Sequence, residues 1–570
     1  MKLIEKLKKE KKDIPHLCSE DFLSPYTSCW LCIVEIEGEK RPLPSCWYEY
    51  KKNLKFKYNT DELNRIRKEI LSLYLSNHFA DCIAPCKEAC PSRIDIQGYI
   101  RLIREGKYLE AYELIRKRCP IPRVIGRVCP RFCEKECYRN LIDEPLRIND
   151  LKRFVSDMIA PTYIPKTVPL KKPRIRVAVI GSGPAGVSCA YYLRRNGIEV
   201  DIYEKEEKAG GLLYYAIPDF RLDKEIVLDE VELILKEEIR IFYKKEWGRD
   251  FSIEDLFEKG YRAIFIAIGS PKSKLVMEGG IGSLEFLRDY NLGRIEKIEG
   301  NVIVMGGGNT AMDCALVGKK LGGDVKIVYR RTREEMPAFD EEVENVLKEG
   351  IEIKYLLNPR EFKDGKLILE KMKLGEKDAS GRRRPVGTGK YEEIKCDYFI
   401  QAVGQNFYFP EDVKGIRNVY FIGDALTGPK TVIEAIASGL DTAEEFLLEL
   451  EGKKKEKSFF SKKSFFSVKR EDFKVNVEKR KDLPSEADRC MECGCKEVEV
   501  CKLRKYSAKY DAEPSYKGEF VKTVNDFSDE FIVYEREKCI LCGECVRAVS
   551  YTHLRAHETR HDLVCRLLLE

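Results

Sequence analysis

Residues 174–211 read RIRVAVIGSGPAGVSCAYYLRRNGIEVDIYEKEEKAGG, and this stretch decides the fold of the protein. Its pattern predicts a strand over 177–180, a glycine turn, an amphipathic helix and a second strand over 200–204. Glycines let the backbone approach a pyrophosphate at the helix N-terminus, where unpaired N–H groups favour negative charge. The stretch therefore predicts a dinucleotide-binding unit, with its turn and its ribose-binding acid at Gly181, Gly183, Gly186 and Glu204. The alternative is a glycine turn in some other α/β domain.

Length and charge limit the class of protein. The chain has 570 residues, enough for several domains. Its 102 Lys and Arg residues nearly balance 96 Asp and Glu residues, and the net charge of +6 indicates no nucleic-acid or membrane footprint. No apolar run reaches the roughly 18 residues of a membrane span, and no apolar core of a signal peptide follows the basic start. We expect a cytoplasmic protein that binds no nucleic acid.

The chain contains 22 cysteines, most of them in tight clusters. In a reducing compartment such clusters indicate metal sites before disulfides. Cys189, Cys314 and Cys396 stand apart, and we expect them to be small core residues. Neither Cys189 nor Cys314 has a CxxC partner, which argues against a dithiol site of the thioredoxin reductase type.

The first cysteine cluster has the spacing C-x10-C-x2-C-x13-C, formed by Cys18, Cys29, Cys32 and Cys46. Two of these ligands are expected in a tight loop and the last after a strand over 33–37, as a plant-type [2Fe–2S] fold would deliver them, and structural zinc is the alternative. The segment resembles the ferredoxin-like domain that opens the large iron–sulfur subunit of complex I and many hydrogenases. That resemblance implies a β-hairpin before the first helix, whereas this chain starts within the helix. We therefore expect a truncated or misassigned start.

Two further runs of cysteines follow in NHFADCIAPCKEACP and GRVCPRFCEKEC. They resemble the N-terminal domain of the glutamate synthase small subunit and of dihydropyrimidine dehydrogenase. The resemblance implies two [4Fe–4S] clusters whose ligands cross between the runs: Cys82, Cys86, Cys90, Cys129, Cys133 and Cys137. Relatives have one more cysteine upstream, where this chain has His78, which is either a ligand or a helix-capping residue. Cys119 also lies between the runs, and a polar fourth ligand of relatives falls near Lys152, a poor ligand.

A second nucleotide unit starts at Asn301 with NVIVMGGGNTAMDC. Its GxGxxA turn predicts NADP contacts from Gly306, Gly308, Asn309, Thr310 and Ala311. The next strand ends in Arg330 and Arg331, which would pair with a 2′-phosphate, so NADP is favoured over NAD. Arg333 could assist. The alternative is that these arginines belong to a solvated loop.

The segments around this unit resemble a flavoprotein with two dinucleotide domains. The strand DYFIQAVGQ (397–405) is expected to return to the first domain, and the resemblance implies that the following helix N-terminus faces the flavin. The order of FAD half, NADP insert and FAD half is typical of the glutamate synthase small subunit. The FAD contacts that this resemblance adds to the glycine turn are Pro184, Ala185, Gly211, Leu212, Arg221, Gly423, Asp424, Thr431 and Val432.

The carboxy-terminal region differs in composition. Residues 451–489 are charged and aperiodic and predict a solvated linker, although their Phe pairs could dock a partner. An iron–sulfur or zinc site is then expected from Cys490, Cys493, Cys495 and Cys501. Cys539, Cys542 and Cys545 begin a bacterial ferredoxin run, but Val549 stands where the fourth cysteine belongs. We expect residues from about Val549 to be a foreign tail, the alternative being a His-rich zinc tail.

Together these patterns predict an α/β protein with two Rossmann-like domains, preceded by a small β-rich domain and a helical iron–sulfur domain. The expected cofactors are FAD, NADP(H), [2Fe–2S] and two or more [4Fe–4S] clusters. The expected function is electron transfer from NADPH through FAD and the clusters to ferredoxin or a catalytic subunit of glutamate synthase, hydrogenase or formate dehydrogenase type. The alternative is a non-catalytic iron–sulfur relay subunit. The expected domains are 1–60, 61–165, 172–295 with 395–450 (FAD), 296–394 (NADP), the linker 451–489, the Cys-rich segment 490–548 and the tail 549–570.

Overall fold

The computed structural model describes most of the chain before residue 454 and separate segments after it. The described residues are 1–20, 26–76, 78, 82–378, 381–406, 413, 415–453, 477–495, 500–514, 539–540, 542–544 and 547. Cys545 and the expected foreign tail from Val549 lie outside these residues.

Residues 174–211 fold as predicted, into β4 (Arg176–Ile180), α9 (Pro184–Arg195) and β5 (Glu199–Tyr203). These strands lie in a parallel sheet of order β16-β7-β4-β5-β6, completed by β6 (Arg240–Phe242), β7 (Ala263–Ile266) and β16 (Val419–Phe421). Helix α17 (Val432–Leu450) packs closely on α9 at Gly439, where a Cβ would clash with the backbone of Ala185, so the absence of a side chain permits the close approach. The other helices of this domain are α10 (Leu212–Tyr215), α11 (Lys224–Leu235), α12 (Ile253–Glu258) and α16 (Asp424–Thr427).

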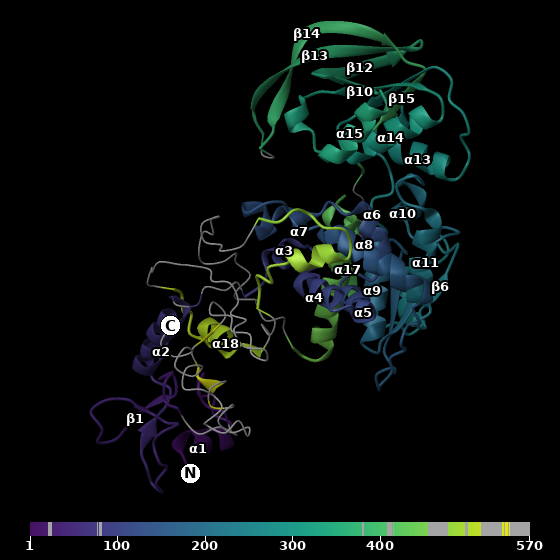
Figure 1. The fold of residues 1–570 in the computed structure, drawn as a ribbon. Helices are drawn as coiled ribbons and strands as arrows, with labels where there is room; N and C mark the ends of the chain where they lie inside the picture. The colour runs from purple at the N-terminus through teal and green to yellow at the C-terminus, as the bar shows by residue number, and fades with distance from the viewer. Residues whose placement is uncertain are drawn as a thin grey trace.

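The second nucleotide domain forms a sheet of its own, at the top of Figure 1. Its parallel order is β11-β10-β9-β15-β8, and an antiparallel sheet β12-β13-β14 extends it. The strands are β8 (Ile281–Gly282), β9 (Asn301–Met305), β10 (Asp324–Tyr329), β11 (Glu352–Tyr355), β12 (Leu357–Lys363), β13 (Lys366–Lys377), β14 (Arg383–Lys395) and β15 (Tyr398–Gln401). The helices are α13 (Ser283–Asn291), α14 (Asn309–Lys320) and α15 (Asp340–Lys348).

Strand β15 corrects the expected return to the first domain. It pairs with β9 on one side and β8 on the other, with Phe399 opposite Ile303. The chain therefore re-enters the first domain only at β16. Phe399 and Ile400 are buried, and such an apolar run fits the middle of either parallel sheet.

The helical domain shares one hydrophobic core with the first nucleotide domain, in which Ile125 and Leu151 pack with residues such as Val187 and Val231. Across this boundary the buried Arg116 guanidinium lies 3.2 Å from the Glu237 carboxylate. The helices are α2 (Asp61–Ser76), α3 (Pro85–Ala89), α4 (Ile96–Arg104), α5 (Tyr108–Arg116), α6 (Pro122–Val128), α7 (Phe132–Lys135) and α8 (Ile148–Ile159).

The amino-terminal domain lies at the opposite end of Figure 1 from the second nucleotide domain. It contains α1 (Leu3–Lys9) and an antiparallel sheet of order β2-β1-β3, formed by β1 (Ile33–Ile36), β2 (Leu43–Pro44) and β3 (Phe56–Lys57). Arg67 of α2 is buried and donates hydrogen bonds to the carbonyls of Leu31, Ile33 and Tyr58, which fixes α2 on this domain. Helix α18 (Lys502–Lys509) packs against α2.

The described part of the expected linker corrects the sequence interpretation. Residues 477–489 include the 3-10 helix η6 (Ser485–Arg489), which packs on α4. Glu486 and Arg489 are fully buried there, so this part of the chain is docked on the helical domain rather than solvated. Charge alone suggested solvent exposure because Asp143, which pairs with Arg489 on the helical domain, lies 346 residues away in the sequence.

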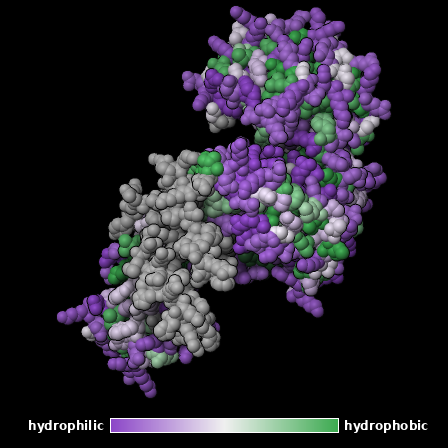
Figure 2. Space-filling model, in the orientation of Figure 1, coloured by the Kyte–Doolittle hydropathy of each residue, from purple (hydrophilic) through white to green (hydrophobic). Residues whose placement is uncertain are grey.

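The visible surface of the two nucleotide domains is mainly hydrophilic, with hydrophobic side chains in small patches (Figure 2). Among the described residues, no helix combines the length and the apolar character needed to cross a bilayer.

Candidate functional site

A cavity of about 670 Å³ opens at the carboxyl ends of β4, β5, β7 and β16. In open α/β sheets this edge is where ligands bind. The expected FAD contacts that line the cavity are Gly181, Gly183, Pro184, Ala185, Glu204, Gly211, Leu212, Asp424, Thr431 and Val432. Ten dispersed residues named from the sequence thus meet at one site.

The glycine turn after β4 has the geometry that a pyrophosphate requires. Gly181 has φ +104°, and a Cβ there would lie 2.5 Å from the carbonyl oxygen of Ala267. Gly186 lies outside the cavity lining, and its missing Cβ instead lets α9 pack on the Gly181 carbonyl. A Cβ at Gly183, the residue before α9, would meet no described protein atom within 4 Å. Packing therefore does not demand glycine at 183, whereas a ligand approaching the backbone does.

Glu204 lies beside this turn at the end of β5. Its carboxylate accepts hydrogen bonds from the Ser182 N–H (2.8 Å) and Ser182 Oγ (2.5 Å), and from the Glu206 N–H (2.9 Å). The acid is buried yet lines the cavity, so it is held where a ribose would contact it.

The opposite wall of the cavity comes from the end of β16 and the start of α17. Burial raises the pKa of Asp424 to about 6, although the Lys430 N–H donates to its Oδ1 at 3.2 Å. The Thr431 side chain and N–H both donate to Glu434, which caps the first turn of α17. Gly423 does not line the cavity; its missing Cβ lets this turn approach Ala185.

Arg221 departs from its expected role at FAD. It is absent from the cavity lining, and its guanidinium pairs with Asp313 Oδ2 (2.7 Å) and Glu342 Oε1 (2.7 Å) of the second nucleotide domain. Arg288, which the sequence did not indicate, lines the cavity and forms two hydrogen bonds with Glu206 (2.9 and 2.7 Å). No local motif marks Arg288, because its partner lies 82 residues away.

The second glycine turn repeats the first. Gly306 has φ +148°, and a Cβ there would clash with the carbonyl oxygen of Ala402, just as a Cβ at Gly181 would clash with that of Ala267. Gly308 precedes α14, and a Cβ there meets no described atom within 4 Å, as at Gly183. Ala311 is buried against Gly306, whereas Thr310 is half-buried. The Asn309 amide oxygen accepts a hydrogen bond from the Phe339 N–H (2.9 Å), which ties the turn to the segment after β10.

The two arginines at the end of β10 lie in different environments. Arg331 is buried, donates to the Arg383 carbonyl (2.8 Å) and pairs with Asp378 (2.7 Å). Arg330 is exposed, although neighbouring residues desolvate part of its side chain; this desolvation and then the like charge of Arg331 lower the pKa of Arg330. Arg330 is thus the arginine of this pair that is open to solvent, at the end of the strand next to the one that leads into the second glycine turn.

The cysteines of the amino-terminal domain come together. Cys18 hydrogen-bonds with Cys29, which lowers the pKa of Cys18 and raises that of Cys29. Cys32 and Cys46 form a second such pair, and the charges of Cys18 and Cys29 also act on Cys46. All four thiols are buried. The structure therefore gathers the four cysteines that the C-x10-C-x2-C-x13-C spacing singled out.

The cysteines of the helical domain separate into two groups. Cys86 and Cys137 line one small cavity, together with Cys490 and Cys493 from the carboxy-terminal segment. Lys152 is buried in the other group; burial lowers its pKa, but the charges of Cys129, Cys119, Cys133 and Cys90 more than compensate and raise it. The expected crossing of ligands between the two runs fits this partition.

Two further carboxy-terminal cysteines, Cys501 and Cys542, lie elsewhere. Cys501 packs in a cluster with Cys18 and Cys29, so the structure divides the group Cys490, Cys493, Cys495 and Cys501. Cys542 packs against the same cluster. His78 is buried, which lowers the pKa of its ring, while a hydrogen bond with the backbone of Cys539 opposes this effect. Cys189, Cys314 and Cys396 are fully buried, which confirms them as core residues.

Within the part of the chain that the structure describes, no three His, Cys, Asp or Glu side chains converge as they would around a single metal ion. A cubane cluster does not require such convergence, because each of its four thiolates binds a different iron. The grouping of the cysteines around one space is therefore the relevant criterion.

Comparisons with known proteins agree with this architecture. The pyridine nucleotide-disulphide oxidoreductase family matches residues 175–408, and the family of dihydropyrimidine dehydrogenase domain II, 4Fe-4S cluster, matches residues 65–163. The chain is similar to the protein YgfK of Escherichia coli strain K12 (32% identity, covering 78% of this chain and 48% of that protein). It is also similar to the NADP(+)-dependent formate dehydrogenase subunit beta of Moorella thermoacetica (36% identity, covering 62% and 58%).

The chain thus spans about half the length of these two relatives. It covers more of the glutamate synthase [NADPH] small chain of Escherichia coli strain K12, with 33% identity over 56% of this chain and 73% of that protein. On this similarity, and with the two glycine turns and the cysteine-rich helical domain in place, the chain belongs to the family of the glutamate synthase small chain.

Proposed function

We propose that the protein is an NADPH-dependent flavin and iron–sulfur oxidoreductase that passes electrons from NADPH through FAD and its clusters to a partner protein or carrier. The observation that carries the proposal is the cavity of about 670 Å³, which joins a dinucleotide turn, a ribose-binding acid and a helix N-terminus at one sheet edge. Gly183 and Gly308 leave open space beside two helix N-termini, which supports one dinucleotide at each sheet.

The residues of the first site fit FAD. The Gly181–Gly183 backbone and the start of α9 would hold the pyrophosphate, and Glu204 would accept from a ribose. FAD, when bound, takes up hydride as an electron pair and releases single electrons. The N-terminus of α17 at Thr431 and Val432 lines the same cavity, so its dipole would stabilise negative charge there.

The residues of the second site fit NADPH better than NADH. Arg330 is exposed beside the buried Arg331, with Arg382 adding positive charge. A 2′-phosphate would pair with the exposed Arg330 guanidinium, whereas the hydroxyl of NADH would not. Arg330 would contact the phosphate, and Arg331 would hold the loop through Asp378.

The cysteine groups fit iron–sulfur clusters. The four buried thiols at Cys18, Cys29, Cys32 and Cys46 would hold a [2Fe–2S] cluster, and the helical domain would hold [4Fe–4S] clusters. The helical domain shares its core with the FAD domain, which supports direct electron transfer between them. These cysteines must stay reduced to bind iron, and the cytoplasm is the compartment that keeps thiols reduced, so it is the proposed site of action.

The electron acceptor would be ferredoxin or a catalytic subunit. The Moorella thermoacetica relative is itself named as the beta subunit of an NADP(+)-dependent formate dehydrogenase, which supports a partner subunit. A glutamate synthase large subunit or a hydrogenase subunit is the other candidate.

Anaerobic titration of the purified, FAD-loaded protein with NADPH tests the proposal. The visible absorbance of the flavin should bleach with NADPH at lower concentrations than with NADH. If neither nucleotide bleaches the flavin, the oxidoreductase activity is ruled out and a non-catalytic relay role replaces it.

A further inference from the structure

We propose that Cys490 and Cys493 are ligands of a [4Fe–4S] cluster whose other two ligands are Cys86 and Cys137. The carboxy-terminal segment would thereby complete an iron–sulfur site of the helical domain, about 400 residues upstream. The inference rests on the proposed function only in that the protein binds iron–sulfur clusters, and it can be tested without any activity.

The first support is the shared space. Cys86, Cys137, Cys490 and Cys493 line the same small cavity. The rest of the lining includes the apolar side chains of Ile96, Ile100, Leu146 and Ile148. Four cysteines around an apolar space fit the ligand set of a cubane.

The second support is the number of thiols available. Among the described cysteines of the helical domain, Cys86 and Cys137 line this cavity, whereas Cys90, Cys119, Cys129 and Cys133 do not. Cys82 is described but does not line it. A cubane needs four ligands, so two must come from outside the domain. The Cys-x2-Cys spacing of Cys490 and Cys493 can deliver two thiolates to one cluster, as in ferredoxin runs.

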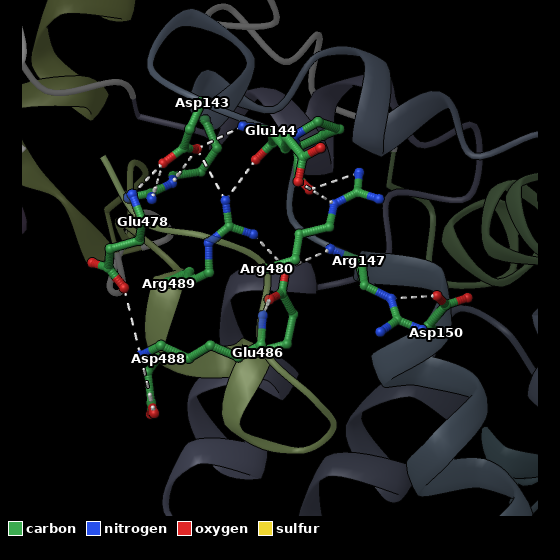
Figure 3. Close-up of polar contacts among 12 residues, drawn as sticks. Asp143, Glu144, Arg147, Asp150, Glu478, Arg480, Glu486, Asp488 and Arg489 are labelled. Atoms are coloured by element: carbon green, nitrogen blue, oxygen red, sulfur yellow. Dashed lines mark hydrogen bonds and ion pairs between the residues drawn. The ribbon is translucent and has the colours of Figure 1, made fainter. Parts of the chain in front are cut away.

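The third support is the ion-pair network that holds the segment before Cys490 (Figure 3). The fully buried Arg489 pairs with Asp143 (3.0 Å) and Glu486 (2.6 Å) and donates to the Glu144 carbonyl (2.8 Å). Glu486 also accepts from the Arg147 N–H (3.3 Å). Buried charges are costly unless paired, so this network specifies one docked position.

The fourth support is the clamp on the segment itself. The Gln97 side chain donates to the Gly494 carbonyl and accepts from the Gly494 N–H, both at 2.8 Å. A Cβ at Gly494 would lie 2.5 Å from the backbone nitrogen of Ala84. Arg104 of α4 pairs with Glu492, between the two cysteines. The loop is therefore held against α3 and α4 on both sides of Cys493.

Iron content and paramagnetic resonance of full-length, anaerobically purified variants test the proposal. Cys490→Ser/Cys493→Ser should lose about four irons and four sulfides per chain, together with one reduced-cluster signal. Cys86→Ser should lose the same signal. The combined triple variant should lose no more iron than either, because all these thiols serve one cluster. Ser485→Ala, an exposed change in the same segment, should keep the full iron content.

Two outcomes would overturn the proposal: unchanged iron in Cys490→Ser/Cys493→Ser, or additive losses of about eight irons in the triple variant. FAD content reports folding independently. Because FAD binding and bleaching by NADPH use the other domains, retained bleaching with a lost cluster supports the inference. Failure of bleaching in the wild-type protein would instead contradict the proposed function alone. A second variant, Gly494→Ala, should lose the same cluster by displacing the loop from Ala84.

Discussion

At the scale of single residues, one backbone geometry recurs at the two glycine turns, and the residue that follows the second strand differs between them. Gly181 and Gly306 approach the carbonyls of Ala267 and Ala402 in the same way. Glu204 follows β5 in the first domain, and Arg330 follows β10 in the second. An acid suits a free ribose hydroxyl and repels a phosphate, whereas a guanidinium pairs with a phosphate. The two sites therefore differ in charge rather than in shape.

Arg330→Ala should raise the KM for NADPH about tenfold and leave the KM for NADH nearly unchanged, because a charge-assisted hydrogen bond is worth about 1.5 to 3 kcal/mol. Steady-state reduction of an artificial acceptor with both nucleotides measures the ratio. Lys348→Ala, which removes an exposed charge in the same domain, is the matched control. An unchanged ratio of the two KM values contradicts the role of Arg330.

Arg331→Ala should lower stability instead, since it breaks a buried pair with Asp378.

The positions of residues that belong to a short local motif could be predicted from the sequence. The glycine turns, Glu204 and Asp424 lie within strand–turn–helix units whose spacing carries the geometry. Arg221 and Arg288 could not be placed, because their partners Asp313 and Glu206 lie 92 and 82 residues away. The same holds for the cysteines: spacing groups Cys490 with Cys501, whereas folding brings Cys490 to Cys86.

At the scale of elements, a carboxylate of one domain caps a helix of another. Glu230 of α11 accepts a hydrogen bond from the Val124 N–H (3.0 Å) in the first turn of α6. Among the described residues its other oxygen has no hydrogen-bond partner. Burial raises the pKa of Glu230 to about 8, against the opposing effect of the backbone hydrogen bonds. Desolvation thus outweighs the favourable helix N-terminus.

This shift predicts a pH-dependent stability. In the unfolded chain this carboxyl loses its proton above about pH 4.5, whereas in the folded protein it keeps the proton up to about pH 8. The contribution of Glu230 to stability therefore falls as the pH rises from about 4.5 to about 8. Glu230→Gln removes that dependence while its amide oxygen still accepts from Val124. The drop in melting temperature between pH 6 and pH 8.5 should be several degrees smaller in Glu230→Gln than in wild type. The exposed Glu232→Gln on the same helix should behave as wild type, and an equal drop in all three proteins would refute the effect of burial.

At this scale, the periodicity of the sequence predicted whether an element is a helix or a strand, but it did not predict to which sheet a strand belongs. Strand β15 is apolar on both faces, so nothing in its residues distinguishes the FAD sheet from the NADP sheet. Its partner β9 is fixed by the register of Phe399 with Ile303, a contact across 96 residues. Similarly, the charged residues of 477–489 match a solvated linker until their partners at 143–147 are known.

At the scale of the whole molecule, the proposed function requires the two nucleotide domains to hold their ligands in a fixed relation for hydride transfer. Arg221, from the segment after α10, pairs with Asp313 on α14 and Glu342 on α15. Nearby, Tyr290 donates to Asp219 at 2.7 Å. Burial raises the pKa of Asp313, and the pairing with Arg221 opposes this rise. Arg221 therefore fixes one domain against the other and neutralises a buried acid.

Arg221→Ala should slow flavin reduction by NADPH more than tenfold without loss of FAD, because small errors in donor position reduce the rate strongly. It should also destabilise the protein by about 3 to 5 kcal/mol, since Asp313 keeps a buried charge without its cation. Stopped-flow reduction and thermal unfolding measure the two effects.

The double variant Arg221→Ala/Asp313→Asn separates these effects. It removes the buried charge of Asp313 but does not restore the ion pairs between the two domains. The stability of the protein should therefore recover, while flavin reduction by NADPH stays slow. Lys320→Ala breaks an exposed ion pair with Asp219 at the same boundary and should change the rate less than about twofold. If Arg221→Ala reduces its flavin at the wild-type rate, the ion pairs serve stability alone, and the relative position of the two domains must be set by the contacts of α10 with α13.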